Sequence, residues 1–486
     1  MNPAPDRASI QRTLDAIGQQ HVLAFFDTLD AAAQRGLLDQ LASVNLDSIP
    51  ALVSGYVKSK PKHDAAAAPE PVPFFGLGGS ATSGGSAWDV AQATKHGEDL
   101  IAAGKVAAFT VAGGQGTRLG FDGPKGCYPG GAVTGKPLFA CLAEWILATQ
   151  RKYAKGPASL TIPWYIMTSP LNHAATVAFF EKNAYFGLAK SNVMFFPQGM
   201  MPAFDMATGK MLLSAPGELA LSPDGHGGSL AALVRSGAIA DMKRRGVEIL
   251  SYTQIDNPLV RVIDPAFIGL HAQGAGSSGQ MSSKMIPKAA PDEKVGVFCR
   301  LGGKTAMMEY SDLPAELARK VDGAGKAVFN AGNPAIHILS VSFIEQLATA
   351  GSGVAMPLHR AEKKVPFVDL ATGKQAEPTS PNAIKLELFI FDALALCQGS
   401  IVLETDRAEE FAPIKNATGT DSAESSRAMQ TARAARWIEQ AGGSVPRRPD
   451  GTPDCVLELS PLTALWPAEL RGKALPVIAA GSRVPF

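Results

Sequence analysis

The chain has no excess of charge of either sign. Its 486 residues include 45 lysines and arginines and 44 aspartates and glutamates. A dedicated nucleic-acid-binding protein shows a basic excess or a basic stripe, so we expect no nucleic acid among the partners. The five cysteines are dispersed and form no Cys-x-x-Cys pair. We therefore expect neither a disulfide framework nor a zinc site, and we predict a reducing compartment, the cytoplasm.

Long apolar runs are absent as well. No run approaches the ~18 residues that indicate a membrane-spanning helix. The segment Met1–Thr13 includes Asp6 and Arg7 and lacks the apolar stretch of a secretory signal. We expect no membrane partner. Hydrophobic residues nevertheless make up 46% of the chain, which is enough to bury large cores, and the length favours two or three domains.

Changes in composition along the chain predict three parts. Near the N-terminus, Ile10, Leu14 and Ile17 recur at helical spacing. Segment 64–86 is rich in Ala and Pro and then in Gly and Ser, which is typical of a linker or an exposed strap. The predicted parts are an N-terminal helical region with its linker (1–87), a central domain (88–395) and a C-terminal domain (396–486).

The central part alternates short apolar runs with helical stretches, which is typical of an α/β domain. The predicted strands are 106–111, 163–168, 193–196, 248–255, 296–301 and 337–341, and the predicted helices are 138–151, 174–183, 230–245 and 343–350. We therefore predict an α/β fold with a mixed, mostly parallel central sheet and smaller N-terminal helical and C-terminal domains.

The most informative segment is residues 112–126, which we call the glycine loop. A predicted strand leads directly into Gly113 and Gly114. Glycines at the end of a strand let backbone N–H groups approach a phosphate chain closely. Arg118 and Lys125 add positive charge where a polyphosphate would lie. The glycine loop therefore predicts a site for nucleotide phosphates.

The glycine loop matches neither of the two best-known phosphate-binding motifs. From Gly114 its spacing is Gly-x-Gly-x-x-x-Gly, one residue longer than the dinucleotide-binding motif. The Gly135-Lys136 pair that follows continues into Pro137, whereas a P-loop requires Ser or Thr. A glycine-rich structural turn is the alternative interpretation. The combination of several glycines with two cationic side chains favours the phosphate site.

The segment AGGQGTRLG followed by PKG resembles the signature of the eukaryotic-type UDP-sugar pyrophosphorylases, especially those specific for UDP-N-acetylglucosamine. Further matches occur in order and include FFPQGMMPAF (195–204), LSPDGHGG (221–228), DNPLVRV (256–262), EYSD (309–312), FNAGN (329–333), PNAIKLELFIFD (381–392) and FAPIKNA (411–417). The resemblance extends from about residue 88 to about residue 417. It implies a nucleotidyltransferase fold of the Rossmann-like type for the central domain.

The resemblance also implies a reaction, in which a sugar 1-phosphate attacks the α-phosphorus of UTP in line and pyrophosphate leaves. Such a step requires positioning and neutralisation of charge by Lys, Arg and Mg²⁺ rather than a covalent nucleophile. Consistently, the sequence contains neither Gly-x-Ser-x-Gly nor His-Glu-x-x-His. The implied partners are UTP and a sugar 1-phosphate, with Mg²⁺ as cofactor, and we expect a monomer or a weak homo-oligomer.

By resemblance, the nucleotide would lie on the glycine loop and on several later segments. The implied UTP-binding residues are Val111, Ala112, Gly113, Gly114, Lys125, Gln198, Gly225, Asp256 and Lys385. Gln198 and Gly225 would contact the uracil. Asp256 follows a predicted strand, where a carboxylate can hold Mg²⁺; a turn or cap aspartate before Asn-Pro is the alternative. Arg118, Lys125 and Lys415 would be the catalytic residues.

By the same resemblance, a second group would bind the sugar. It comprises His226, Gly296, Glu309, Tyr310, Asn333 and Lys415. Many N-acetylglucosamine enzymes have Asn where this chain has His226, and related UDP-glucose and broad-specificity enzymes carry Gly-His-Gly in this region. The spacing from Gly296 to Glu309 and Asn333 favours N-acetylglucosamine 1-phosphate. Glucose or galactose 1-phosphate stays open as the alternative.

Two other classes of function stay open at this point. A glycosyltransferase that consumes a UDP-sugar usually holds its metal with Asp-x-Asp, and the sequence contains no such pair. A non-catalytic nucleotide-sugar-binding protein would be expected to lose some of the charged residues. Arg118, Lys125, Asp256 and Lys415 are all present, which favours an enzyme.

Overall fold

The computed structural model describes residues 6–60, 68–82, 85–155, 160–349 and 356–486. The chain divides into two compact units. Unit 1 comprises Met1–Ala66, Gln198–Ala231 and Val354–Asp392, and unit 2 comprises Ala67–Pro197, Ala232–Gly353 and Ala393–Phe486. Each unit therefore combines segments that lie far apart in the sequence.

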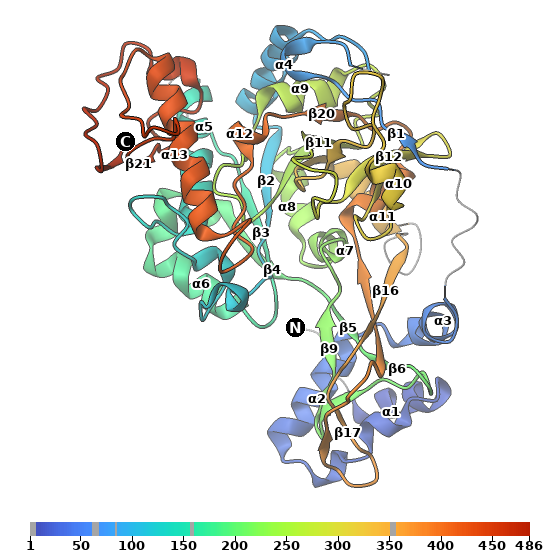
Figure 1. The fold of residues 1–486 in the computed structure, drawn as a ribbon. Helices are drawn as coiled ribbons and strands as arrows, with labels where there is room; N and C mark the ends of the chain where they lie inside the picture. Colours follow the sequence, from blue (N-terminus) through green and yellow to red (C-terminus); the bar gives the residue numbers. More distant parts are fainter. Residues whose placement is uncertain (1–5, 61–67, 83–84, 156–159, 350–355) are drawn as a thin grey trace. The chain divides into compact units, whose positions relative to one another are not determined.

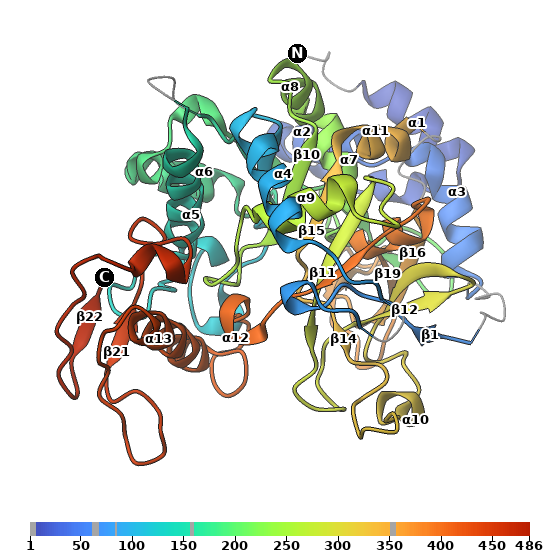
Figure 2. The same cartoon turned by 90° about the horizontal axis from the view of Figure 1, so that it is seen from above.

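The centre of unit 2 is a mixed sheet, which confirms the α/β prediction. Within the described residues this sheet has 11 strands. Its parallel part consists, in spatial order, of β10 (Ile249–Gln254), β2 (Val106–Val111), β3 (Trp164–Thr168) and β4 (Val193–Pro197). Strands β2, β3 and β4 are labelled in Figure 1 and β10 in Figure 2. These strands coincide with the predicted ones to within one residue at each end. Strands β2, β3 and β10 are almost entirely buried, as expected for parallel strands covered by helices on both faces.

The remainder of the sheet is built mainly from antiparallel pairs. It contains β15 (His337–Ser340) beside β10, then β11 (Met281–Pro287), β14 (Ala331–Gly332), β12 (Val297–Leu301) and β13 (Lys304–Met308), with β20 (Val402–Glu404) parallel to β11. Gly302 and Gly303 have φ angles of 56° and 81°. This two-residue turn closes β12 and β13 into an antiparallel hairpin. Parallel pairing is thus concentrated on one side of β10, and the sheet is mixed as predicted but not mostly parallel.

Helices cover the sheet of unit 2. They include α4 (Val90–Ala102), α5 (Leu138–Tyr153), α6 (His173–Lys182), α8 (Ala238–Arg244), α9 (Pro265–Gln273) and α11 (Val341–Thr349). The later helices are α12 (Arg407–Glu410) and α13 (Ala423–Gln440), and α13 shares a separate buried cluster with β21 (Val456–Glu458). Figures 1 and 2 both show α4 and α9 side by side. Their close approach requires glycine, because a Cβ on Gly97 would lie 1.9 Å from the Pro265 carbonyl oxygen. Among the described helices, none combines the length and apolarity needed to cross a membrane.

The predicted helix 230–245 is in fact two helices. Helix α7 (Gly228–Arg235) ends before Gly237, and α8 begins after it. Gly237 has a φ angle of 80°, in the left-handed region that terminates helices and is accessible mainly to glycine. The periodicity of the apolar residues continues through this interruption, which is why the sequence pattern alone predicts one helix.

Unit 1 joins the N-terminal helices to a small antiparallel sheet. The helices are α1 (Arg7–Ala16), α2 (Ala31–Ser43) and α3 (Ile49–Leu52), and the sheet is β16 (Leu358–Lys363), β19 (Ala383–Leu388) and β6 (Phe204–Asp205). Strands β5 (Met200–Pro202) and β9 (Leu221–Pro223) form a separate pair. Leu14 and Leu37 share one buried cluster with Phe204 and Leu386. This apolar packing confirms the predicted helical N-terminus.

Part of the predicted linker packs into unit 2. Strand β1 (Glu70–Pro71) pairs with β12, and the backbone of Phe75 exchanges hydrogen bonds with Val402 and Glu404. Val72 and Phe75 are buried. The prediction of an exposed strap is therefore wrong at these two positions, where isolated apolar residues supply the packing; residues 64–67 and 83–84 of this segment lie outside the described residues.

Candidate active site

The glycine loop is held in place by hydrogen bonds to its own backbone and to one asparagine. The Lys125 N–H donates to the Gly114 carbonyl (3.0 Å). The Asn172 side-chain amide donates to the carbonyls of Ala112 (3.0 Å) and Gly114 (3.2 Å). Asn172 is itself buried and belongs to no motif that the sequence analysis identified. Arg118 lies in a short 3₁₀ turn of the loop and is exposed.

Lys125 and Asp256 form an ion pair at the carboxyl ends of two neighbouring strands. Val111 is the register partner of Gln254, so the loops that follow β2 and β10 emerge side by side. The Lys125 Nζ lies 3.3 Å from the Asp256 Oδ2. Burial alone would raise the pKa of Asp256, but the positive charges of Lys125 and Lys415 outweigh it and lower that pKa below its ordinary value. Asp256 is therefore a carboxylate at neutral pH.

Lys415 reaches the same strand end from a distant segment. The Ile414 N–H donates to the Asp256 carbonyl (2.9 Å). The Lys415 Nζ lies 3.8 Å from the Asp421 Oδ2, and its side chain is 44% exposed. Because its side chain is partly exposed, the Lys415 ammonium group can be reached by an anionic substrate. The structure thus brings Lys125, Asp256 and Lys415 together within unit 2.

Three residues predicted to bind the sugar meet at one end of the antiparallel strands of unit 2. Val297 is the register partner of both Met308 and Gly332. Gly296 therefore lies between Glu309 on one side and Asn333 on the other, and the Asn333 N–H donates to the Gly296 carbonyl (2.8 Å). A Cβ on Gly296 would lie 2.3 Å from the Met307 Sδ. Tyr310, which follows Glu309, is half exposed.

The other predicted residues belong to unit 1. Gln198 follows the last strand of the parallel group and is buried (8% exposed). Gly225 lies against the end of β19, where a Cβ would come within 2.4 Å of the Leu388 carbonyl oxygen, and its φ angle is 83°. Both features require glycine. Lys385 lies on β19 opposite Ala361. The predicted UTP-binding residues are thus divided between the two units.

His226 is held between backbone and aromatic rings of unit 1. The Ile390 N–H donates to the His226 Nδ1 (3.2 Å), and the imidazole stacks on Phe389 with ring centroids 5.3 Å apart. Burial, together with the charge of His359, lowers the pKa of His226 to about 4. The ring is therefore neutral at physiological pH, and because Nδ1 accepts, the proton lies on Nε2.

His359 and Asp392 support this aromatic group and were not identified from the sequence. The His359 ring stacks on Phe389 with centroids 4.1 Å apart, and its Nε2 lies 2.8 Å from the Asp392 Oδ2. A histidine and an aspartate 33 residues apart form no recognisable motif. The sequence indicated this group only through the alternation of Phe389 and Phe391. Such a pattern is more often typical of a strand in the core.

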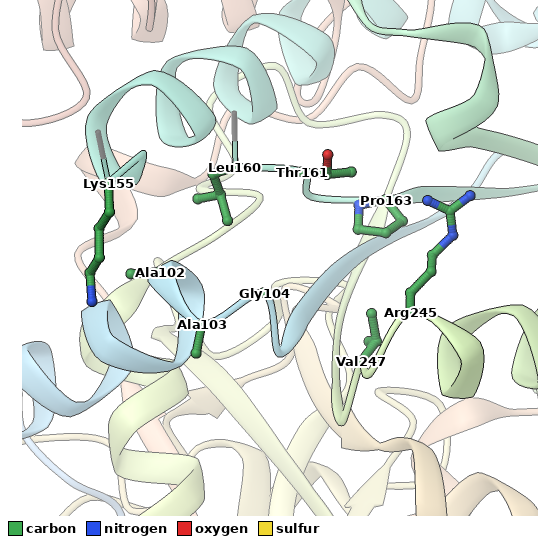
Figure 3. A pocket seen from close by; sticks show the side chains of 9 residues that line it. All are labelled: Ala102, Ala103, Gly104, Lys155, Leu160, Thr161, Pro163, Arg245 and Val247. Atoms are coloured by element: carbon green, nitrogen blue, oxygen red, sulfur yellow. The ribbon is translucent and has the colours of Figure 1, made fainter. Parts of the chain in front are cut away.

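A cavity of 420 Å³ in unit 2 lies away from these residues. It is lined by residues that precede the parallel strands, such as Gly104, Pro163 and Val247, with Lys155 and Arg245 at its sides (Figure 3). Ligands of open α/β sheets bind at the carboxyl ends of the strands, whereas this cavity is at the amino ends. It is therefore not the site of the predicted chemistry.

Comparison with known proteins shows extensive similarity. The family described as UTP–glucose-1-phosphate uridylyltransferase matches residues 87–436. UDP-N-acetylglucosamine diphosphorylase 1 of Arabidopsis thaliana is 36% identical over 95% of this chain and 90% of its own length. UDP-N-acetylglucosamine pyrophosphorylase of Saccharomyces cerevisiae is 38% identical over 72% of this chain and 73% of its own. The crystal structure of the Trypanosoma brucei uridine diphosphate N-acetylglucosamine pyrophosphorylase with an inhibitor superposes with a TM-score of 0.77, at 27% identity over 96% of this chain and 94% of that chain.

Proposed function

The chain belongs to the UTP–glucose-1-phosphate uridylyltransferase family, and we propose that it transfers the uridylyl group of UTP to N-acetylglucosamine 1-phosphate, releasing pyrophosphate. Members of this family are nucleotidyltransferases, and this chain is therefore a nucleotidyltransferase. The observation that carries the proposal is the ion pair of Lys125 with Asp256 at the carboxyl ends of β2 and β10, with Lys415 beside it. The names of the relatives supply the choice of sugar.

The proposed reaction is an in-line attack by a phosphate oxygen of the sugar phosphate on the α-phosphorus of UTP. The bond from the α-phosphorus to the bridging oxygen breaks, and pyrophosphate leaves with that oxygen. Negative charge builds up on the α-phosphoryl oxygens and on the leaving group. Lys125 and Arg118 would neutralise the charge of the UTP phosphates, and Lys415 would neutralise the sugar phosphate.

Mg²⁺ remains a proposal, and Asp256 is the residue that would hold it. Mg²⁺ in nucleotide sites usually takes one or two carboxylates and completes its shell with water and substrate phosphates. Among the described residues, no group of three or more His, Cys, Asp or Glu side chains could hold a metal by itself. A single ionised carboxylate at the strand end fits an ion shared with UTP. When bound, Mg²⁺ would supply positive charge on the phosphates.

We assign recognition of base and sugar to the remaining residues. Buried Gln198 and the glycine backbone at Gly225 would contact the uracil. Glu309 and Asn333, which flank Gly296, would accept and donate hydrogen bonds with the sugar. The Nε2–H of neutral His226 would donate to a sugar or acetamido oxygen, a contact that Asn would make in many relatives. Monomeric or weakly oligomeric state and cytoplasmic location stay predictions from the sequence.

Steady-state assays with UTP and a panel of sugar 1-phosphates test the proposal. We expect the highest kcat/KM with N-acetylglucosamine 1-phosphate and pyrophosphate release without any glycosyl acceptor. Equal or better kcat/KM with glucose or galactose 1-phosphate would overturn the choice of sugar while leaving the reaction class intact. This second candidate is favoured by His226, since related UDP-glucose enzymes carry Gly-His-Gly in this region. Product formation only in the presence of a glycosyl acceptor would indicate a glycosyltransferase instead.

A further inference from the structure

Asn257, the residue after the proposed metal ligand, joins two segments that are far apart in the sequence. Its side-chain Nδ2 donates to the Glu410 carbonyl (2.7 Å). Its Oδ1 accepts from the Ala412 N–H (3.0 Å) and from the Leu259 N–H (3.1 Å). Asn257 is buried (5% exposed). One amide group therefore bonds both a carbonyl and an N–H of the segment that leads to Lys415.

The bonds continue in register along this segment. The Glu410 carbonyl and the Ala412 N–H bind the Asn257 side chain, and the Ile414 N–H binds the Asp256 carbonyl. Alternate residues from the last residue of α12 to Ile414 are thus tied to two consecutive residues of the loop after β10. The side-chain amide of Asn257 takes the place of a backbone partner that the loop does not provide.

A buried ion cluster fixes the start of the segment. The Lys284 Nζ lies 2.7 Å from both carboxylate oxygens of Glu410 and 2.7 Å from the Asp264 Oδ2. Thr405 Oγ1 donates to Glu410 as well (2.6 Å). Lys284 and Glu410 are essentially inaccessible to solvent. Because a buried carboxylate with this many partners cannot shift without leaving a charge unpaired, the Glu410 carbonyl is a rigid acceptor for Asn257.

We propose that Asn257 is a positioning residue for uridylyl transfer, which holds Lys415 beside Asp256 through the segment from Glu410 to Ile414. This inference rests on the proposed function, because it assigns the effect of Asn257 to the part that Lys415 plays in that reaction. Asn257 touches no substrate in this scheme. Asn257 fixes the distance and the direction of the Lys415 ammonium group relative to the reacting phosphates. Reaction rates are very sensitive to such positioning.

Unit 1 offers a matched control. The Gln19 side chain donates to the Gly209 carbonyl (3.1 Å) and accepts from the Met211 N–H (2.8 Å). Gln19 is as buried as Asn257, at 5% exposure. Like Asn257, Gln19 therefore donates to the carbonyl of one residue and accepts from the N–H of the residue two positions later in a distant segment. That segment contains no proposed site residue. The loss of Gln19 reports what this bridge contributes to folding alone.

The test is a double-mutant cycle with kcat as the readout. We expect Asn257→Ala to lower kcat for UTP and N-acetylglucosamine 1-phosphate about tenfold or more in the wild-type background, and less than about twofold in a Lys415→Ala background. Asn257→Ala and Gln19→Ala should lower the melting temperature by similar amounts, but Gln19→Ala should leave kcat within about twofold. If Asn257→Ala does not fold, Asn257→Ser takes its place, since it keeps a polar side chain, adds no charge and is too short to keep both bonds.

The outcomes separate the inference from the proposed function. An equal loss of kcat from Asn257→Ala in both backgrounds, or no loss in either, would overturn the positioning role while the enzyme stays a uridylyltransferase. A Lys415→Ala variant with unchanged kcat would contradict the part of Lys415 in the proposed function itself. Inactivity of the wild-type chain with every sugar 1-phosphate would contradict the proposed function.

Discussion

The two units hold their proposed site residues by different kinds of interaction. In unit 2 the residues proposed to act on the phosphates are charged and include an ion pair, that of Lys125 with Asp256. In unit 1 the corresponding residues are largely neutral: His226 stacks on Phe389, and Gly225 presents its backbone beside Leu388. We propose that the charged residues around Asp256 in unit 2 neutralise phosphate charge, whereas Gln198, Gly225 and His226 in unit 1 recognise neutral groups. Substitutions of these charged residues in unit 2 should therefore lower kcat, and those of the neutral residues in unit 1 should change KM and selectivity.

The largest effect is expected in unit 2. Lys125→Ala removes a cation from the phosphate site, and we expect kcat to fall about 100-fold or more with little change in melting temperature. Lys105 is the matched control, since its Nζ pairs with Glu248 at 2.6 Å at the opposite end of the same two strands. Lys105→Ala should retain kcat within about twofold. A Lys125→Ala enzyme as active as this control would remove the distinction between the units.

A smaller effect of another kind is expected from unit 1. Gln198→Ala should raise KM for UTP about tenfold and leave kcat within about threefold, because it removes contacts made equally in the ground and transition states. Discrimination between UTP and CTP should decrease in parallel, as measured by the ratio of kcat/KM values. A fall in kcat at unchanged KM would place Gln198 with the charged residues of unit 2.

The choice of sugar should respond to His226 more weakly still. His226→Asn keeps a hydrogen-bond donor and loses the stacking on Phe389. We expect the ratio of kcat/KM for N-acetylglucosamine and glucose 1-phosphates to change about threefold to tenfold. Because the pKa of His226 is about 4, this ratio in the wild-type enzyme should be the same at pH 6 and pH 9. An inflection near pH 6.5 that disappears in His226→Asn would contradict the neutral donor.

The smallest expected effect concerns stability and involves both units. Burial lowers the pKa of His226 in unit 1 and of His271 in unit 2, each to about 4. The unfolded chain binds these protons near pH 6.5 and the folded chain only near pH 4, so stability is complete above about pH 6.5 and falls as the pH decreases toward 4. We expect a decrease of a few degrees in melting temperature between pH 7 and pH 5. Replacing either histidine with a non-ionising residue should reduce this decrease; an unchanged slope would refute the burial argument.

The sequence was sufficient where local pattern and tertiary structure agree. The buried strands from Val106 to Val111 and from Trp164 to Thr168 are apolar runs of strand length, and the glycine loop follows at the position where an α/β sheet binds ligands. Gly296, Glu309 and Asn333 were identified by resemblance, and the register of their strands brings them together.

What could not be predicted depends on long-range contacts. In unit 1, β6 pairs with β19, which lies more than 150 residues further along the chain, and no local pattern encodes that pairing. Asn257 looks like an ordinary turn residue before Pro258, and only its contacts with Glu410 and Ala412 show its role. Asn172 was missed for the same reason, since its carbonyl partners lie in the glycine loop.

The central claim is that the chain exchanges pyrophosphate for a sugar phosphate on the α-phosphorus of UTP. Phosphorus NMR of a mixture of enzyme, Mg²⁺, UTP and N-acetylglucosamine 1-phosphate tests it most directly. We predict that UDP-N-acetylglucosamine and pyrophosphate appear in equal amounts, and that the reaction reverses when pyrophosphate is added. Release of UDP or of inorganic phosphate as the main product, or no reaction with any sugar 1-phosphate, would contradict the claim.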